Sequence, residues 1–458
     1  MGDIKHQVTV LLLALLLTVL TVFIFGLELW GTIGCFVTYI VVSDLFMRVD
    51  DNMPMGEIAL FIGAIQWIIA PIVSYSYENK MYPMSVSIET YMSITIPIFL
   101  SFALGVYLFR RDSRNVTLEQ ISDYCAEHLE YAKLLFGVGL VLSFINIDIA
   151  IINFVKVLFS NLVYVGCLMY MYAKPDKATR IALGVCSFLF LRSIAFGAFH
   201  DLMVWGLFIL TNLFFIRNIQ PLSRLFVFSW LLVGVMFLQV VKPMYREQVW
   251  YGDYKGNRVE LFFQLFYESI SSYNKKNIAE GISSRFNQGW IISRIYSRIP
   301  HQKDFYEGKT IIEGVQATLL PRFLAPNKKG AGEQSVQDFR DFTGYNVSKN
   351  TSMGLSLLGE SYGNFGLYGA CLFMFLWGVA IQLLISELKR VAMNYNILWL
   401  LFIPLICFNI IKAEINFISV LNWSVKSTIF AAIVINSLPF IIKKEYDDTI
   451  LPEEEGGC

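Results

Sequence analysis

Long apolar runs separated by short polar loops dominate the hydrophobic pattern of this chain. Each run is long enough to cross a ~30 Å hydrocarbon core as a helix of about 20 residues. Strands of a β-barrel would instead alternate apolar and polar residues over about ten positions. The predicted helices cover residues 8–26, 29–47, 57–75, 91–109, 131–148, 149–172, 179–199, 201–217, 222–242, 366–387, 396–412 and 425–442. The sequence therefore predicts an all-α polytopic membrane protein with about 12 transmembrane helices.

One long polar segment interrupts this series and divides the chain into four regions. Residues 1–242 are predicted to form an N-terminal transmembrane bundle of about nine helices, and residues 243–365 a large loop region. The C-terminal transmembrane helices follow at 366–442, and 443–458 form a tail. Loops longer than ~12–15 residues are usually functional or disordered, so the loop region is the expected place for chemistry.

Helical patterning argues against disorder in the loop region. Apolar residues recur at helical spacing at positions 259, 262, 266 and 270, and again at 311, 315 and 319. Such stripes are typical of amphipathic helices. We expect two or three short helices that lie over the mouth of the bundle.

The distribution of Lys and Arg predicts the orientation. Alternate short loops carry these residues, for example Arg110 with Arg111, and Lys174 with Lys177, whereas the loops between are nearly free of them. Cytoplasmic loops of membrane proteins are the ones enriched in Lys and Arg. Both termini are therefore predicted to be cytoplasmic, and the loop region extracytoplasmic.

Composition narrows the class further. Hydrophobic residues make up 56% of the chain, charged residues 16%, and the formal net charge is zero. A soluble domain carries about 25% charged residues, and a neutral chain has no general attraction for nucleic acid. The seven cysteines and four histidines show no metal-ligand spacing. Neither a metal nor a cofactor is expected.

Ionisable residues inside apolar segments are costly and are functional candidates by default. Arg192 lies well inside one predicted helix, and Lys412 and Glu414 lie near the outer end of another. Internal pairs, Arg192 with Asp201 and Lys412 with Glu414, would be a structural explanation. The functional explanation is a cationic cavity that opens outward and suits an anionic, lipid-linked substrate.

A second basic feature lies in the loop region. Arg294 and Arg298 are four residues apart, which places two like charges on one helical face, an arrangement that destabilises an isolated helix. Acidic partners elsewhere in the fold would explain it structurally. A phosphate clamp would explain it functionally, because guanidinium groups bind phosphate oxygens in a bidentate way.

The segment 319–369 carries a family resemblance. The motif LLPRFLAPNK at 319–328, followed by SLLGESYGNFGLYG at 356–369 at the start of a helix, resembles the bacterial oligosaccharide repeat unit polymerases, the Wzy-type O-antigen polymerases. The helix count and the position of the large loop agree with that family. One departure is Lys329-Gly330, where the family pattern would have a proline.

The resemblance implies a metal-independent glycosyltransferase of the GT-C type at the outer face of the bacterial inner membrane. It would transfer a growing glycan from undecaprenyl pyrophosphate to a lipid-linked repeat unit. The groups expected to bind the pyrophosphate are Arg192, Arg294, Arg298, Arg322 and Lys328. Besides this lipid-linked oligosaccharide and the membrane lipid, a chain-length regulator protein is a candidate partner.

A base for the acceptor hydroxyl is also implied, and a carboxylate or an imidazole can serve. Glu360 and His301 are the leading candidates, followed by Glu414, which is also expected at the substrate, and by Asp201. Structural roles compete with these assignments: Glu360 could cap the helix that follows it in the sequence, and His301 could be an ordinary loop residue.

Two other activities remain open at this point. An O-antigen ligase would use the same donor with a different acceptor. A lipid-linked oligosaccharide flippase or another transporter would also need a cationic cavity, although transporters usually show internal repeats, which we do not find in the sequence.

Overall fold

The structure is a computed structural model. It describes residues 2–47, 53–76, 82–110, 116–145, 150–197, 199–252, 254–271, 286–320, 330–348 and 353–448. Helices alone make up the regular secondary structure of this part of the chain. Those that form the bundle are α1 Gly2–Phe25, α2 Leu29–Met47, α3 Met55–Ala64, α4 Ala70–Ser76, α5 Ile88–Leu108, α6 Leu118–Glu127, α7 Leu129–Ser143, α8 Ala150–Ser160, α9 Leu162–Ala173, α10 Ala178–Phe196, α11 His200–Ile216, α12 Pro221–Arg246, α18 Leu357–Asn394, α19 Leu398–Ile406 and α20 Phe417–Asp448.

Among the described residues, nine helical stretches are long and apolar enough to cross a membrane. They correspond to nine of the twelve predicted segments, so the chain is an all-α protein with several candidate membrane spans. The other three segments appear as shorter helices, α7 with 15 residues, α11 with 17 and α19 with 9. The prediction was furthest off at 396–412, because the helix ends at Ile406 and residues 407–416 are non-helical.

Glycines bring the central helices close together. An added Cβ at Gly105 of α5 would lie 2.2 Å from the carbonyl oxygen of Phe375 in α18, and one at Gly378 would lie 2.6 Å from that of Phe102. Small residues allow this close approach of helices in membranes. The crossing of α5 and α18 therefore depends on glycine on both helices.

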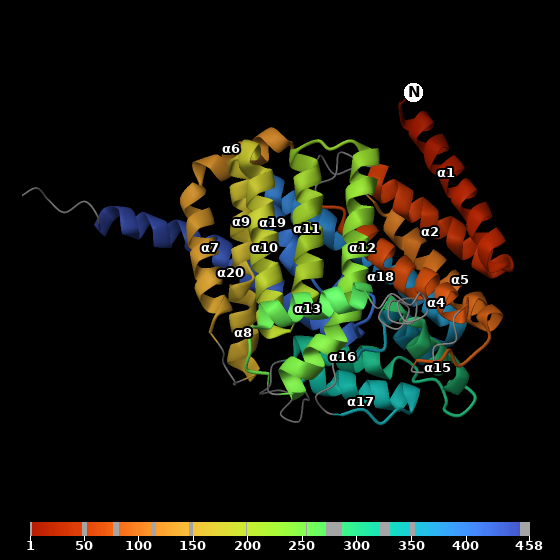
Figure 1. The fold of residues 1–458 in the computed structure, drawn as a ribbon. Coiled ribbons are helices and arrows are strands. Elements are labelled where there is room, and N and C mark those ends of the chain that lie inside the picture. The colour runs from red at the N-terminus through yellow and green to blue at the C-terminus, as the bar shows by residue number, and fades with distance from the viewer. Residues whose placement is uncertain are drawn as a thin grey trace, which may run out of the picture.

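Four helices in the described part of the loop region lie together at one end of the bundle, at the bottom of Figure 1. They are α13 Arg258–Ser271, α15 Gly289–Arg298, α16 Lys309–Leu319 and α17 Ala331–Thr343. Two or three were expected. Helix α6, from the loop predicted to be cytoplasmic, lies at the opposite end (Figure 1).

The predicted boundary between loop region and membrane at residue 366 is a kink inside α18. Gly366 has φ 66° and ψ −170°, and it interrupts an otherwise continuous helix of 38 residues. Only glycine adopts this conformation without strain. Residues 357–365 therefore form a separate short helical segment, which is mostly buried and packs against α15.

Candidate functional site

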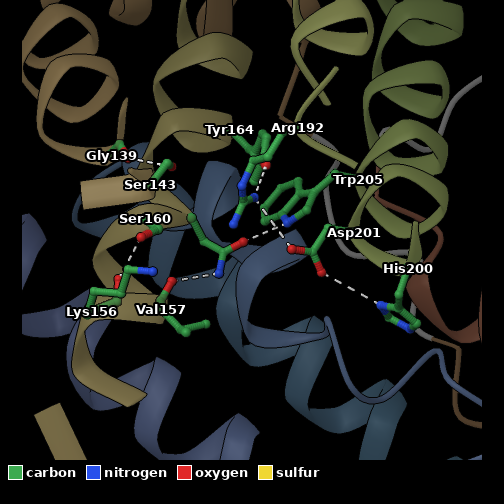
Figure 2. Close-up of polar contacts among 11 residues, drawn as sticks. Gly139, Ser143, Lys156, Val157, Ser160, Tyr164, Arg192, His200, Asp201 and Trp205 are labelled. Atoms are coloured by element: carbon green, nitrogen blue, oxygen red, sulfur yellow. Dashed lines mark hydrogen bonds and ion pairs between the residues drawn. The ribbon is translucent and has the colours of Figure 1, made fainter. Parts of the chain in front are cut away.

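Arg192 lies near the end of α10 and contacts groups from two other helices. Its Nη1 atom donates a hydrogen bond to the hydroxyl of Tyr164 in α9 (2.9 Å) and lies 3.5 Å from Oδ2 of Asp201 in α11 (Figure 2). The side chain of Arg192 is 21% exposed and that of Asp201 is 40% exposed. The ion pair of Arg192 with Asp201, which the sequence suggested as a structural explanation, is therefore present, and both of its side chains are partly exposed to solvent.

His200 lies between two carboxylates. Its Nδ1 atom is 3.7 Å from Oδ1 of Asp201, and its Nε2 atom is 3.6 Å from Oε1 of Glu414. Asp201 thus faces Arg192 with one oxygen and His200 with the other (Figure 2). The imidazole connects the arginine on α10 with the non-helical segment before α20.

Lys412 completes what we term the Arg192 network, which comprises Arg192, His200, Asp201, Lys412 and Glu414. The Nζ atom of Lys412 donates to Oδ1 of Asn409 (2.7 Å) and lies 3.9 Å from the ring centroid of Phe408. Burial opposes ionisation of Glu414, but its contact with His200 and the charge of Lys412 lower its pKa to about 2. Glu414 is therefore an anion throughout the neutral range.

The Arg192 network and its surroundings together carry an excess of positive charge. Two basic side chains face two carboxylates, and the charge of Arg192 also acts on Lys156 of α8, which adds a third cation nearby. Such a group can stabilise an additional anion, because fixed cations in a partly dry site interact strongly with negative charge.

Aromatic packing holds Arg192 in place. Tyr164, its hydrogen-bond partner, packs on Trp205 with ring centroids 4.5 Å apart. The indole Nε1 of Trp205 donates to Oδ1 of Asn161 (2.7 Å). All three of these side chains are buried, so the support of the arginine is rigid.

The C-terminus of α10, next to Arg192, is capped by four side chains from the chain segment 245–258. The last three carbonyl groups of α10 and that of the next residue each accept a bond from one of these side chains: Ile194 from Tyr245, Ala195 from Arg258, Phe196 from Trp250 and Gly197 from Arg246. Helix ends leave such carbonyls without partners, and cations are favourable there. The cap fastens α12 and α13 beside the Arg192 network.

Glu360 lies in a different environment. It is fully buried, its Oε1 accepts from the hydroxyl of Thr310 (2.8 Å), and its Oε2 accepts from the backbone N–H of Phe417 (2.7 Å). Phe417 is the first residue of α20, so Glu360 caps that helix. The geometry favours a structural role for Glu360, but the helix that it caps is α20 and not the helix that follows it in the sequence.

The segment 414–417 connects the Arg192 network with Glu360. The side chain of Glu414 faces His200, and three residues later the backbone of Phe417 binds Glu360. The side chain of Asn416 accepts a hydrogen bond from the backbone of Leu355 (2.8 Å). Asn416 and Phe417 are buried, whereas Glu414 and Ile415 are partly buried.

Arg294 and Arg298 are held by the loop region itself. The Nε atom of Arg294 donates to the carbonyl of Thr343 (3.0 Å), and its guanidinium lies 5.2 Å from the ring centroid of Tyr345. Arg298 packs against Gly344, the residue after α17. Within the described part of the chain, no polar contact joins either arginine to the Arg192 network, so these contacts do not extend the network to α15.

His301 is the last candidate within the described residues, and it belongs to neither group. His301 is exposed in the turn that follows α15, and no polar contact joins it to Glu360 in the ranges that the structure describes. Arg322 and Lys328 lie outside the described residues.

A family model matches residues 90–443, which is most of the chain and includes the whole Arg192 network. The chain belongs to the family described as domain of unknown function (DUF8712). No curated protein and no solved structure matches it. The family assignment therefore brings no activity with it, and the function has to be argued from the site.

Some members of the site gave no signal in the sequence. Tyr164 and Thr310 stand in stretches where a tyrosine or a threonine is ordinary, and only the fold places them on Arg192 and Glu360. The cap of α10 was equally hidden, although two of its donors are arginines. His200 and Asp201 did stand out, as charged residues at the end of a predicted helix.

Proposed function

We propose that this protein is a membrane glycosyltransferase that polymerises a glycan. It transfers the growing chain from a polyprenyl pyrophosphate to the hydroxyl of a lipid-linked repeat unit. The observation that supports this most is the Arg192 network, in which accessible cations, two carboxylates and an imidazole meet at the end of the bundle that the loop-region helices occupy.

The cations of the network suit the leaving group. When the bond between the sugar C1 and the phosphate oxygen breaks, negative charge develops on the pyrophosphate. Arg192, Lys412 and Lys156 supply positive charge where this anion forms. Because packing holds Arg192 in place, its charge is already in position when the bond to the phosphate breaks.

His200 and Asp201 suit the acceptor. The acceptor oxygen forms the new bond to C1, and its proton passes to His200, whose two nitrogens face Asp201 and Glu414. The carboxylates then stabilise the imidazolium. We assign the base to this pair rather than to Glu360, whose oxygens both hold hydrogen bonds inside the protein.

The proposal includes a placement in the membrane. The nine long helices, together with α7, α11 and the α19 segment, give twelve crossings, with both termini cytoplasmic and the loop region extracytoplasmic. The fold is then of the GT-C type, and the compartment is the outer face of a bacterial inner membrane. The donor lipid is undecaprenyl pyrophosphate, and Arg322 and Lys328 remain proposed phosphate ligands.

Reconstitution tests the activity directly. The purified protein is placed in proteoliposomes with lipid-linked repeat units, and the products are separated on gels. We expect a ladder of glycans that grows with time. Transfer of a single glycan to lipid A only would identify a ligase, and movement of substrate across the bilayer without growth would identify a flippase; either result rejects the proposal.

Variants of the network test the site. We expect Arg192→Gln and Asp201→Asn each to lower the polymerisation rate by about 10²-fold or more, the scale of one acid–base or electrostatic group. Arg217→Gln is the control, because Arg217 is an exposed arginine at the far end of α11 that bonds Thr179 and the carbonyl of Asp176. Wild-type rates in both network variants would exclude this site.

A further inference from the structure

Helix α13 has two exposed faces of opposite character. Residues four positions apart lie on the same face of a helix. Val259, Phe263 and Tyr267 follow this spacing and are all exposed, Phe263 by 53% and Tyr267 by 72%. The residues that come directly after these three are also exposed, and all are polar: Glu260, Gln264 and Glu268. An apolar face and a polar face therefore lie side by side on this helix.

The third face of α13 packs against the bundle. Leu261, Phe262 and Leu265 are buried in a hydrophobic cluster with residues of α10 and α12. Arg258, the first residue of α13, donates a hydrogen bond to the carbonyl of Ala195 in α10. These contacts fix the position of α13 along the bundle and its rotation about its own axis.

Ring contacts place α13 beside the long apolar helices and not beyond their ends. Phe266 packs on Phe237 of α12 with ring centroids 6.0 Å apart, and Phe263 on Phe190 of α10 at 6.4 Å. Phe237 stands 13 residues before the end of the apolar stretch that closes at Trp250, and Phe190 stands six residues before the end of α10. At 1.5 Å per residue these separations are about 20 Å and about 9 Å. Helix α13 therefore lies at a depth that lipid occupies around the bundle.

The apolar face of α13 continues the lipid-facing surface of the bundle. Leu191, next to Phe190 on α10, is 55% exposed, and Val233, one turn before Phe237 on α12, is 42% exposed. Large apolar side chains exposed together mark a surface that meets a membrane or a partner. Because these residues belong to candidate membrane spans, lipid is what meets them, and Phe263 extends the same surface onto α13.

The orientation of α13 explains why it needs both faces. The helix lies crosswise to α10 and α12 near the lower end of the bundle (Figure 1). A helix in this position turns one flank toward the membrane interior and the other toward water. Helices that lie in a membrane interface bury their apolar face about 5–10 Å into the boundary between head groups and acyl chains. Tyr267 stands at the edge of the apolar face, and tyrosine is enriched at that boundary.

We infer that α13 is an interfacial helix that binds the phospholipid layer at this end of the bundle. Val259 and Phe263 contact the acyl chains, and Glu260 and Gln264 face water. The inference does not depend on the proposed glycosyltransferase activity, because it uses only the packing of α13 beside α10 and α12.

Fluorescence quenching in nanodiscs of phosphatidylcholine tests the inference. The variants Phe263→Cys and Gln264→Cys each carry a small thiol-reactive fluorophore, and the unsubstituted protein gives the background from native cysteines. One quencher is a doxyl-labelled phosphatidylcholine in the bilayer, and the other is iodide in the water. We expect the doxyl lipid to remove about half or more of the fluorescence at position 263 and iodide to remove little, with the reverse at position 264.

A second site on the apolar face guards against loss of structure, because Phe263→Cys also removes the ring contact with Phe190. Val259→Cys should show the same quenching by lipid, and thermal melts show whether each variant is folded. Quenching by iodide at positions 259 and 263 would place the apolar face in water. Protection from both quenchers would show that another segment or a second copy of the chain covers it, and equal lipid quenching at 263 and 264 would remove the distinction between the faces. Each of these three results overturns the inference.

Discussion

Glu360 illustrates, at the scale of the residue, how burial decides between two roles. Its carboxylate binds Thr310 and the N-terminus of α20 and is closed to solvent. We expect Glu360→Gln to keep polymerisation measurable, since one amide oxygen can still accept. Glu360→Ala should lower the melting temperature, because each buried donor left without a partner costs about 1–3 kcal/mol.

The matched control for this pair is Glu387→Gln on the exposed part of the same helix, where neither stability nor activity should change. A folded Glu360→Gln protein without any polymer would return Glu360 to the list of catalytic residues.

Asp338 gives a pH dependence of stability. It is 4% exposed, and burial together with the carboxylate of Glu360 raises its pKa to about 7. The unfolded chain ionises near pH 4, so the folded state binds more protons between pH ~4 and ~7. Stability contributed by this site is therefore present below pH ~4 and falls as the pH rises to 7.

The Asp338→Asn variant should not lose this stability as the pH rises. The melting temperature of the variant should therefore exceed that of the wild type at pH 7.5 and approach it near pH 4. Asp304→Asn, at an exposed loop position, is the control. Melting curves at several pH values, followed by intrinsic fluorescence, measure the effect. Parallel curves for wild type and Asp338→Asn would show that Asp338 is ionised in the folded protein.

The candidate site was predictable only in part at this scale. Arg192, Asp201 and Glu414 stood out in the sequence because charges in apolar segments are rare. Their connection through His200 did not, since it joins residues more than 200 positions apart and depends on the path of 407–416. Glu360 stood out for its motif, but the sequence could not tell a cap from a base.

Elements were predicted best where apolar composition alone determines them. Nine long helices correspond to predicted segments. The segment 396–412 has the same composition, yet only nine of its residues are helical. Buried non-helical backbone is as apolar as a helix, so hydropathy could not distinguish the two.

The kink at Gly366 is the element-scale feature with the clearest test. A side chain at φ 66° and ψ −170° is strained, and an added Cβ would lie 3.2 Å from the ring of Phe305. We expect Gly366→Ala to lower the free energy of unfolding by about 1–3 kcal/mol. Straightening of α18 would also displace Glu360 from the start of α20.

Gly184→Ala in α10 is the matched control, because no atom lies within 4 Å of its added Cβ and helical alanine is favoured over glycine. Chemical denaturation in mild detergent measures both variants. Equal stability of Gly366→Ala and the wild type would show that the kink is not required.

On the scale of the whole molecule, the two ends of the bundle differ in chemistry. The end at the bottom of Figure 1 holds the loop-region helices, and the opposite end holds α6. The rule for Lys and Arg assigns these ends to the outer and the cytoplasmic side. The sequence could supply this assignment because it depends on loop charge and not on packing.

Cysteine accessibility in intact cells tests the orientation of the whole chain. His301 is exposed in the loop region and Glu119 is exposed on α6, so each can be replaced by cysteine without disturbing a buried contact. We expect a membrane-impermeant maleimide to label His301→Cys in intact cells and Glu119→Cys only after permeabilisation. The unsubstituted protein gives the background, since four of its described cysteines are buried and two are partly buried. The reverse pattern would place the Arg192 network on the cytoplasmic side, where a polymerase of exported glycans could not use it.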